Sequence, residues 1–140
     1  VIDFGERLKS VLTSFMFSDV SSDKVNFFTI NQWFDETLFN ESAMQNLHFP
    51  SVDFDNLKKF NKKFSNTFNE KPNKVSILAY DALGLIYYCW ANNNFQFKED
   101  QLYNKKGFKG LQGEFHIENN ISVQNLKIYK ITEKNFIRVN

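Results

Sequence analysis

Apolar residues recur at helical spacing in two stretches of the chain. The spacing i, i+3, i+4 and i+7 predicts an amphipathic helix over residues 4–17, and its stripe consists of Leu8, Val11, Leu12 and Phe15. A second helix is predicted over residues 54–68, where phenylalanines and a leucine form one face and lysines form the other. Asp53 is expected to cap its start. Pro72 is expected to stop it, because the residue before a proline avoids helical angles.

The helix predicted over residues 74–91, "KVSILAYDALGLIYYCWA", differs because it is apolar on almost every side. Asn73 can cap it, and Gly84 and the alanines let neighbouring elements approach closely. A helix of this kind needs cover on most sides. Cys89 lies within the apolar run and is therefore expected to be a buried, inert thiol and not a nucleophile.

Asp81 is a carboxylate in the middle of this apolar helix, beside Tyr80. Burying an unpaired carboxylate costs several kcal/mol, so Asp81 needs a hydrogen-bond donor. A structural interpretation gives it a hydrogen bond to a nearby helix end or loop. A functional interpretation gives it a contact with a ligand or a hinge. Both interpretations are open at this point.

Short apolar runs elsewhere predict strands. Residues 25–30, "VNFFTI", are bounded by polar residues and predict a buried strand. Residues 47–52, "LHFPSV", predict a second extended piece, with Pro50 marking its end or an edge. A loop with one helical turn is expected between them. After a short helix over residues 98–106, alternating apolar and polar residues predict three linked antiparallel strands, over 113–119, 126–131 and 135–139.

Three evenly spaced glycines, Gly107, Gly110 and Gly113, stand beside a lysine and raise the question of a phosphate-binding loop. Such a loop needs a strand before it and a helix after it, so that backbone N–H groups converge on the anion. Here the predicted order is reversed, because a helix ends at Lys106 and a strand begins near Glu114. The glycines are therefore predicted to end a helix and to shape the tight entry into a strand.

Composition excludes several classes of function. A length of 140 residues suits about one domain, and a net charge of +1 gives no reason to expect nucleic acid or an anionic membrane as a partner. One cysteine allows no internal disulfide. The two histidines, His48 and His116, lie far apart without nearby cysteines or spaced carboxylates, so no metal is expected.

No catalytic motif is present, and we expect neither enzymatic activity nor a cofactor. No apolar run is long enough to span a bilayer. The given sequence does not begin with a signal peptide, so we expect the chain to be a processed form or a fragment.

The segment after residues 25–30 contains a candidate ligand-binding loop. In an open α/β sheet, ligands meet the loops beyond the carboxyl ends of the strands. Trp33 could contact the apolar body of a small ligand, and Asp35 could bind its cationic group. Alternatively, Trp33 and Phe34 could pack under a neighbouring loop.

Four stretches together resemble the type I periplasmic binding proteins, in the branch of branched-chain amino-acid receptors of ABC transporters and penicillin-binding-protein activators. Residues 17–39 resemble a family segment in which a strand ends in a Gly-Thr loop followed by an aromatic and an acidic residue. Residues 46–51, "NLHFPS", stand where the family has Gly-Gly-Trp-Phe/Tyr. Residues 60–86 share the family's Ala-Tyr-Asp-Ala helix, and residues 107–131 share its "Gly-Phe-x-Gly-x-x-Gly-x-Phe" passage into strands.

The resemblance implies an α/β fold, namely part of the three-layer α/β/α type I periplasmic-binding-protein fold with C-terminal antiparallel strands. It implies that residues 1–140 are a single C-terminal fragment of such a domain. It assigns ligand binding to Thr29, Trp33, Asp35 and Phe49, and structural roles to Tyr80, Asp81 and the three glycines. The chain departs from the family where Phe28 and the pair Asn46-Leu47 replace glycines, where Asn120-Ile121 replaces Asn-Gly, and where Asn125 replaces arginine. The lost glycines point away from a standard amino-acid ligand.

The resemblance also implies a function. One hypothesis is a non-catalytic solute-binding module of a bacterial ABC-type transport system, which holds a small polar ligand such as an amino acid between two lobes. The other is an interaction domain of the penicillin-binding-protein activator kind, with a cell-wall synthase as its partner. Both hypotheses imply a periplasmic protein. It would be a lipoprotein if a segment upstream of this chain anchors it to lipid. Because the helix over residues 74–91 lacks the cover that a complete receptor would supply, we predict that the fragment exposes apolar surface and associates with itself or with a partner.

Overall fold

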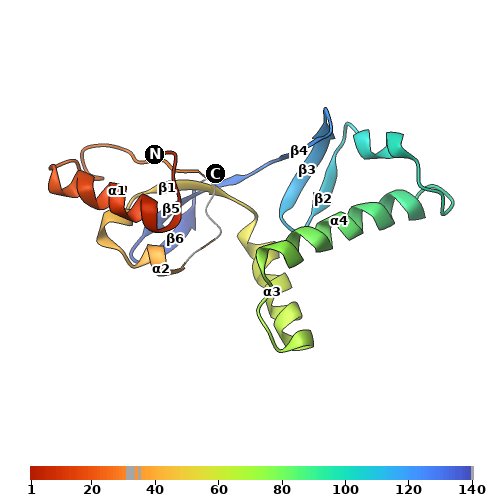
Figure 1. Cartoon of the computed structure of the whole chain (residues 1–140), viewed down its shortest axis with the longest axis horizontal. Coiled ribbons are helices and arrows are strands. Elements are labelled where there is room, and N and C mark those ends of the chain that lie inside the picture. Colours follow the sequence, from red (N-terminus) through yellow and green to blue (C-terminus); the bar gives the residue numbers. More distant parts are fainter. Residues whose placement is uncertain (31–33, 35, 140) are drawn as a thin grey trace. The chain divides into compact units, whose positions relative to one another are not determined.

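The computed structural model describes residues 1–30, 34 and 36–139 (Figure 1). The chain divides into two compact units. The first comprises Val1–Ser51 and Leu126–Asn140, and the second comprises Val52–Asn125. Each unit combines helices with a small antiparallel sheet of its own. The chain thus passes from the first unit to the second after Ser51 and returns after Asn125.

The first unit is built on a three-stranded sheet in the order β1-β5-β6. Its elements are α1 (Gly5–Phe17), α2 (Glu36–Phe39), the 3₁₀ turn η1 (Ser42–Met44), β1 (His48–Ser51), β5 (Lys127–Thr132) and β6 (Asn135–Arg138). The predicted amino-terminal helix is confirmed, and the single helical turn expected near residue 40 corresponds to α2. Pro50 lies in β1, which ends the sheet order, so the predicted edge position is also confirmed.

Apolar side chains from all parts of this unit meet in its core. Leu8 and Leu12 of α1 are buried, as the stripe predicts, and α1 packs against η1. Alternate residues of β1 point inward, so Phe49 and Ser51 are buried. Phe49 is paired in register with Tyr129 of β5. The alternation of side chains along β1 thus places the large aromatic ring of Phe49 in the core of the unit.

The prediction of a buried strand over residues 25–30 is wrong. Only Phe28 forms a β-bridge, parallel to His48, and Val25, Phe28 and Ile30 are exposed. Two hydrogen bonds hold the segment beside β1: the Thr29 N–H donates to the His48 carbonyl at 3.0 Å, and the His48 N–H donates to the Phe27 carbonyl at 2.9 Å. No second strand flanks the segment among the described residues, and an apolar run without partners on both sides does not become a buried strand.

The second unit combines two helices with a second three-stranded sheet, whose strands are in the order β2-β3-β4. Its elements are α3 (Phe54–Phe68), α4 (Lys74–Ala91), the 3₁₀ helix η2 (Glu99–Tyr103), β2 (Phe108–Gly110), β3 (Gly113–Glu118) and β4 (Ile121–Gln124). Both predicted caps are confirmed. Asp53 accepts a hydrogen bond from the Asn56 N–H at 3.1 Å, and Asn73 accepts one from the Ser76 N–H at 2.8 Å.

The carboxyl-terminal strands differ from the prediction in pairing and in number. Residues 118–122 were expected to link two strands of one sheet, but only Asn119 and Asn120 form a tight hairpin turn, and Ile121 begins an additional strand. Asn119 and Asn120 both have positive φ, the backbone that a two-residue hairpin turn requires and that asparagine tolerates. As a result β3 pairs with β4, while β5 pairs with β1 and β6 in the other unit. The predicted helix over residues 98–106 is the shorter 3₁₀ helix η2.

Candidate functional site

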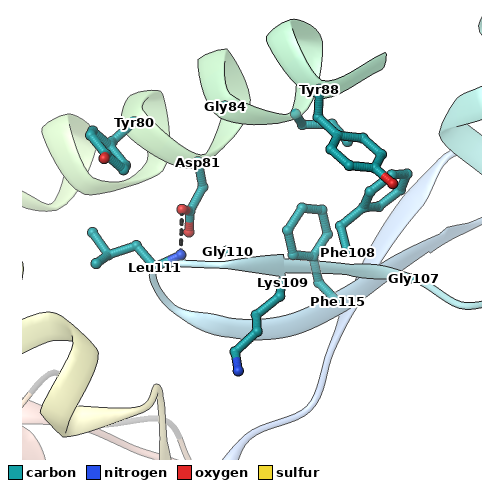
Figure 2. Close-up of a pocket in the computed structure, with 11 residues that line it drawn as sticks. Tyr80, Asp81, Gly84, Tyr88, Gly107, Phe108, Lys109, Gly110, Leu111 and Phe115 are labelled. Carbon is teal, nitrogen blue, oxygen red and sulfur yellow. Dashed lines mark hydrogen bonds between the residues drawn. The ribbon is translucent and has the colours of Figure 1, made fainter. Parts of the chain in front are cut away.

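One polar side chain of the second unit, that of Asp81, lies on α4 and faces the turn between β2 and β3 (Figure 2). Its two oxygens accept hydrogen bonds from the backbone N–H groups of Leu111, at 2.6 Å, and Gln112, at 3.1 Å. These two residues form the loop of the β2–β3 hairpin, between the paired Gly110 and Gly113. The carboxylate therefore satisfies two partly buried donors of a hairpin loop that lies 30 residues away in sequence.

The glycines make this arrangement possible. A Cβ on Gly110 would lie 2.9 Å from the carboxyl carbon of Asp81, so only glycine lets the carboxylate approach the loop this closely. Gly107 has a φ of +68°, and a Cβ there would lie 2.7 Å from the Phe115 carbonyl oxygen. Gly113 has a φ of +117°. The prediction that Gly107 ends a helix is wrong, because η2 ends at Tyr103 and Gly107 directly precedes β2. The predicted tight entry into a strand at Gly110 and Gly113 is confirmed, and strands, not a helix that could bind phosphate, follow the glycines.

A cavity of about 440 Å³ lies between α4 and the β2–β3 hairpin. Asp81 lines it together with four aromatic rings, and Gly84 leaves its helix side open. Figure 2 shows the rings, which are those of Tyr80, Tyr88, Phe108 and Phe115. A second cavity, of about 320 Å³, shares Asp81, Leu85 and Phe115, and its other lining side chains are aliphatic, amide and hydroxyl groups. The helix and the hairpin are thus joined by the Asp81 contact, with open space on either side of it.

The two candidate ligand residues that the structure describes lie in the first unit. Thr29 is 8 % exposed, and its hydroxyl donates to the Asp3 carbonyl at 2.5 Å. Phe49 is 0 % exposed and packs against aromatic rings, so its side chain belongs to the core of this unit. Trp33 and Asp35 lie outside the described residues. The assignment of these four residues to a ligand stays a prediction.

Phe34, for which the sequence offered packing as an alternative, packs against other aromatic rings. Its ring lies 5.1 Å from that of Tyr129, 4.8 Å from that of Phe136 and 5.9 Å from that of Phe49, measured between centroids. The residue that follows Trp33 therefore packs against the aromatic side of the sheet. A positive φ at Phe34 turns the chain there, and no local sequence signal marks that turn.

Reactive and metal-binding groups are sparse in the described part of the chain. Cys89 is 1 % exposed, as predicted, and loss of hydration on burial raises the pKa of its thiol. His116 is half-buried, and its Nε2 lies 3.7 Å from a carboxylate oxygen of Glu118. No group of three or more histidine, cysteine, aspartate or glutamate side chains that could hold a metal occurs among residues 1–30, 34 and 36–139.

Much of α4 remains open to solvent, which confirms the predicted apolar surface. The side chains that face solvent share a large apolar body; they are Val75, Leu78, Tyr80, Leu83, Ile86, Tyr87, Tyr88 and Trp90. We call this set the α4 apolar surface. No helix in the described residues is both long and apolar enough to cross a membrane.

Comparisons with known proteins found similarity in structure only. No family model matches the chain, and no curated protein matches its sequence. Among solved structures, a branched-chain amino acid ABC transporter protein from Rhodospirillum rubrum matches with a TM-score of 0.68 and 10 % identity, over 98 % of this chain and 49 % of that chain. An extracellular ligand binding receptor from Desulfohalobium retbaense matches with a TM-score of 0.62 and 19 % identity, over 99 % of this chain and 25 % of that chain.

A third similar structure is the C-domain of LpoA from Haemophilus influenzae, a regulator of PBP1A. It matches with a TM-score of 0.50 and 10 % identity, over 94 % of this chain and 42 % of that chain. This chain therefore spans between a quarter and about half of the length of the solved proteins that it resembles. At these identities the similarity establishes the fold.

Proposed function

We propose that this chain, which has part of the type I periplasmic-binding-protein fold, is a non-catalytic solute-binding module of an ABC-type transport system. The observation that carries the proposal is the fold similarity along almost the whole chain to the transporter protein of Rhodospirillum rubrum. In the proposed arrangement the chain is the C-terminal portion of a periplasmic receptor, which an upstream segment can anchor to lipid. The rest of the receptor supplies the remaining ligand contacts.

The proposed ligand is a small polar molecule such as an amino acid. Trp33 contacts its apolar part and Asp35 binds its ammonium group. Thr29 lies at the start of the same loop, and its hydroxyl can exchange the Asp3 carbonyl for a ligand oxygen. We assign Phe49 to the same site, because its ring contacts that of Phe34, which stands between Trp33 and Asp35 in the sequence. The roles of Trp33 and Asp35 follow from their chemistry and their positions in the sequence.

A thermal-shift screen of amino acids tests this function on the protein as produced from its gene. A ligand that binds only the folded state at a hundred times its dissociation constant stabilises that state by about 2.7 kcal/mol. For a protein of roughly 150–250 residues the expected rise in Tm is about 5–10 °C, and the rise is smaller for a larger protein. The variant Trp33→Ala should lose the shift, whereas the matched aromatic change Trp90→Ala, on α4, should keep it.

The absence of a shift with every amino acid tested would contradict an amino-acid receptor. The gene sequence upstream of Val1 offers a second check. A signal peptide, a lipid-attachment cysteine and loops able to bind a carboxylate and an ammonium group would support transport.

A second function is a protein-interaction domain of the penicillin-binding-protein activator kind. Two observations favour it: the Thr29 hydroxyl and the Phe49 ring are both engaged within the first unit, and the α4 apolar surface is available for a protein partner. A purified cell-wall synthase should then bind the protein in a surface-based binding assay. An amino-acid-induced shift, with no synthase binding, would exclude this function.

The exposed α4 apolar surface also predicts that the 140-residue chain associates with itself. Light scattering should show an apparent mass that rises with concentration, because association removes apolar area from water. Leu83→Lys, at a position that is 67 % exposed, should restore the monomer. Ile2→Lys, a control at an exposed position of the first unit, should leave the association unchanged. A constant monomer mass across concentrations would show that the surface does not self-associate.

A further inference from the structure

We propose that the 440 Å³ cavity between α4 and the β2–β3 hairpin binds an organic ammonium ion with an apolar body, such as an alkyl or aryl amine. The cavity brings one carboxylate, that of Asp81, together with aromatic rings. It lies within the second unit and shares no residue with the loop assigned to the solute. The inference therefore does not depend on the function proposed above.

The electrostatics of the cavity favour a cation. A carboxylate has about four lone-pair sites, and the N–H groups of Leu111 and Gln112 occupy two of them. No lysine or arginine nitrogen in the described part of the chain lies within 4 Å of the Asp81 oxygens. Lys109 also lines the cavity, but it is exposed, and its side chain points away from Asp81 (Figure 2). The charge of Asp81 is thus held in place by backbone donors, and none of the described lysine or arginine side chains forms an ion pair with it.

The aromatic walls suit the same ligand. An ammonium group is attracted to the face of an aromatic ring, and the attraction grows when water is excluded. The rings also hold one another in position. The centroid of Tyr88 lies 5.8 Å from that of Phe108, and Phe108 lies 5.6 Å from Phe115. Tyr80 packs edge-on against Phe60 of α3 at 5.0 Å.

The size and the opening of the cavity agree with a small molecule. Ligand pockets commonly measure about 300–1,000 Å³ and combine apolar walls with a few polar groups. Gly84 lies one helical turn after Asp81, and a Cβ there would meet no atom within 4 Å. The missing side chain leaves room for the apolar body beside the carboxylate. A ligand that carries its own carboxylate would be repelled by Asp81, so the site selects amines over free amino acids.

Isothermal titration of the 140-residue chain with 2-phenylethylammonium tests the inference, with 2-phenylethanol as the neutral analogue of the same shape. We expect saturable binding of the ammonium ion and at least tenfold weaker binding of the alcohol. Phenylalanine, which adds a carboxylate, should also bind at least tenfold more weakly. Equal binding of the alcohol would show that apolar burial alone drives the interaction and would overturn the proposal.

Two variants locate the site. Asp81→Asn removes the charge and should weaken ammonium binding at least tenfold, but it also disturbs the hairpin loop. Gly84→Leu keeps the carboxylate, fills the cavity from a helix position and should abolish binding while the helical circular-dichroism signal is retained. Ala79→Leu, on an exposed position of α4 that does not line the cavity, is the matched control and should bind as the unchanged chain does. Unchanged binding in Gly84→Leu, or no saturable binding to the unchanged chain at millimolar ligand, would refute the site.

Discussion

Replacing Phe49 with alanine is expected to destabilise the first unit by about 3–5 kcal/mol, as large-to-small changes at buried aromatic positions do. Phe49 is 0 % exposed, and its ring stacks on that of Tyr129 at 5.7 Å and lies 6.0 Å from that of Phe39. Removing it leaves a cavity at the point where the sheet meets the helical turns. Because folded domains are stable by only about 5–15 kcal/mol, this loss is a large share of the total.

Urea unfolding and amide hydrogen exchange measure this effect, and exchange assigns it to the unit concerned. Protection of the β5 amides should fall in Phe49→Ala. The control Phe17→Ala removes the same atoms at a position that is 88 % exposed and should cost little. If the two variants unfolded at the same urea concentration, the ring of Phe49 would not be part of the core. If Phe49→Ala instead lost ligand binding while its free energy of unfolding stayed unchanged, Phe49 would be a ligand-binding residue.

The second large effect is expected for Gly110→Ala, at about 2 kcal/mol in the second unit. The new Cβ would lie 2.9 Å from the Asp81 carboxyl carbon and would push the carboxylate away from the hairpin loop. The N–H groups of Leu111 and Gln112 would then lose their acceptors. Unsatisfied donors at partly buried positions cost more than the net value of the bonds that are lost.

A matched glycine provides the control for this prediction. Gly84→Ala places a Cβ in open space within a helix, where alanine is favoured over glycine by about 0.5–1 kcal/mol, so this variant should be more stable. In a chain that also carries Asp81→Ala, the cost of Gly110→Ala should largely disappear, because the two residues interact directly. Faster exchange of the Leu111 and Gln112 amides would report the broken contact. An unchanged cost in the Asp81→Ala background would show that the carboxylate is not the source of the effect.

Local signals in the sequence identified the three long helices correctly, whereas the helix predicted over residues 98–106 is the shorter 3₁₀ helix η2. Asp53 and Asn73 each cap a helix through a hydrogen bond to a residue three positions ahead, so the relevant partners are all present in a short segment. The apolar stripe of α1 and the lack of a polar side on α4 are likewise properties of one helix. From them the sequence predicted that α1 buries Leu8 and that α4 would keep apolar surface open in this chain.

Pairing between distant segments was harder to predict. An apolar run such as residues 25–30 shows that a strand could form, but only the presence of neighbours on both sides decides whether it does. The additional strand β4 depends on positive φ at Asn119 and Asn120, which asparagine tolerates but does not demand. A different turn there would have left residues 118–122 as the predicted link.

The amino-acid sequence by itself determined the three long helices of this protein, α1, α3 and α4, that its glycines shape a turn, and that Asp81 requires a donor. Those properties depend on hydrogen bonds and side-chain periods within a few residues. Only the tertiary structure decided that the donors are Leu111 and Gln112, that Phe49 fills a core, and that the strands divide between two sheets. Each of these contacts joins residues that are far apart in the chain. Local sequence signals allow many such partners equally well, and only the folding of the whole chain decides which of them meet.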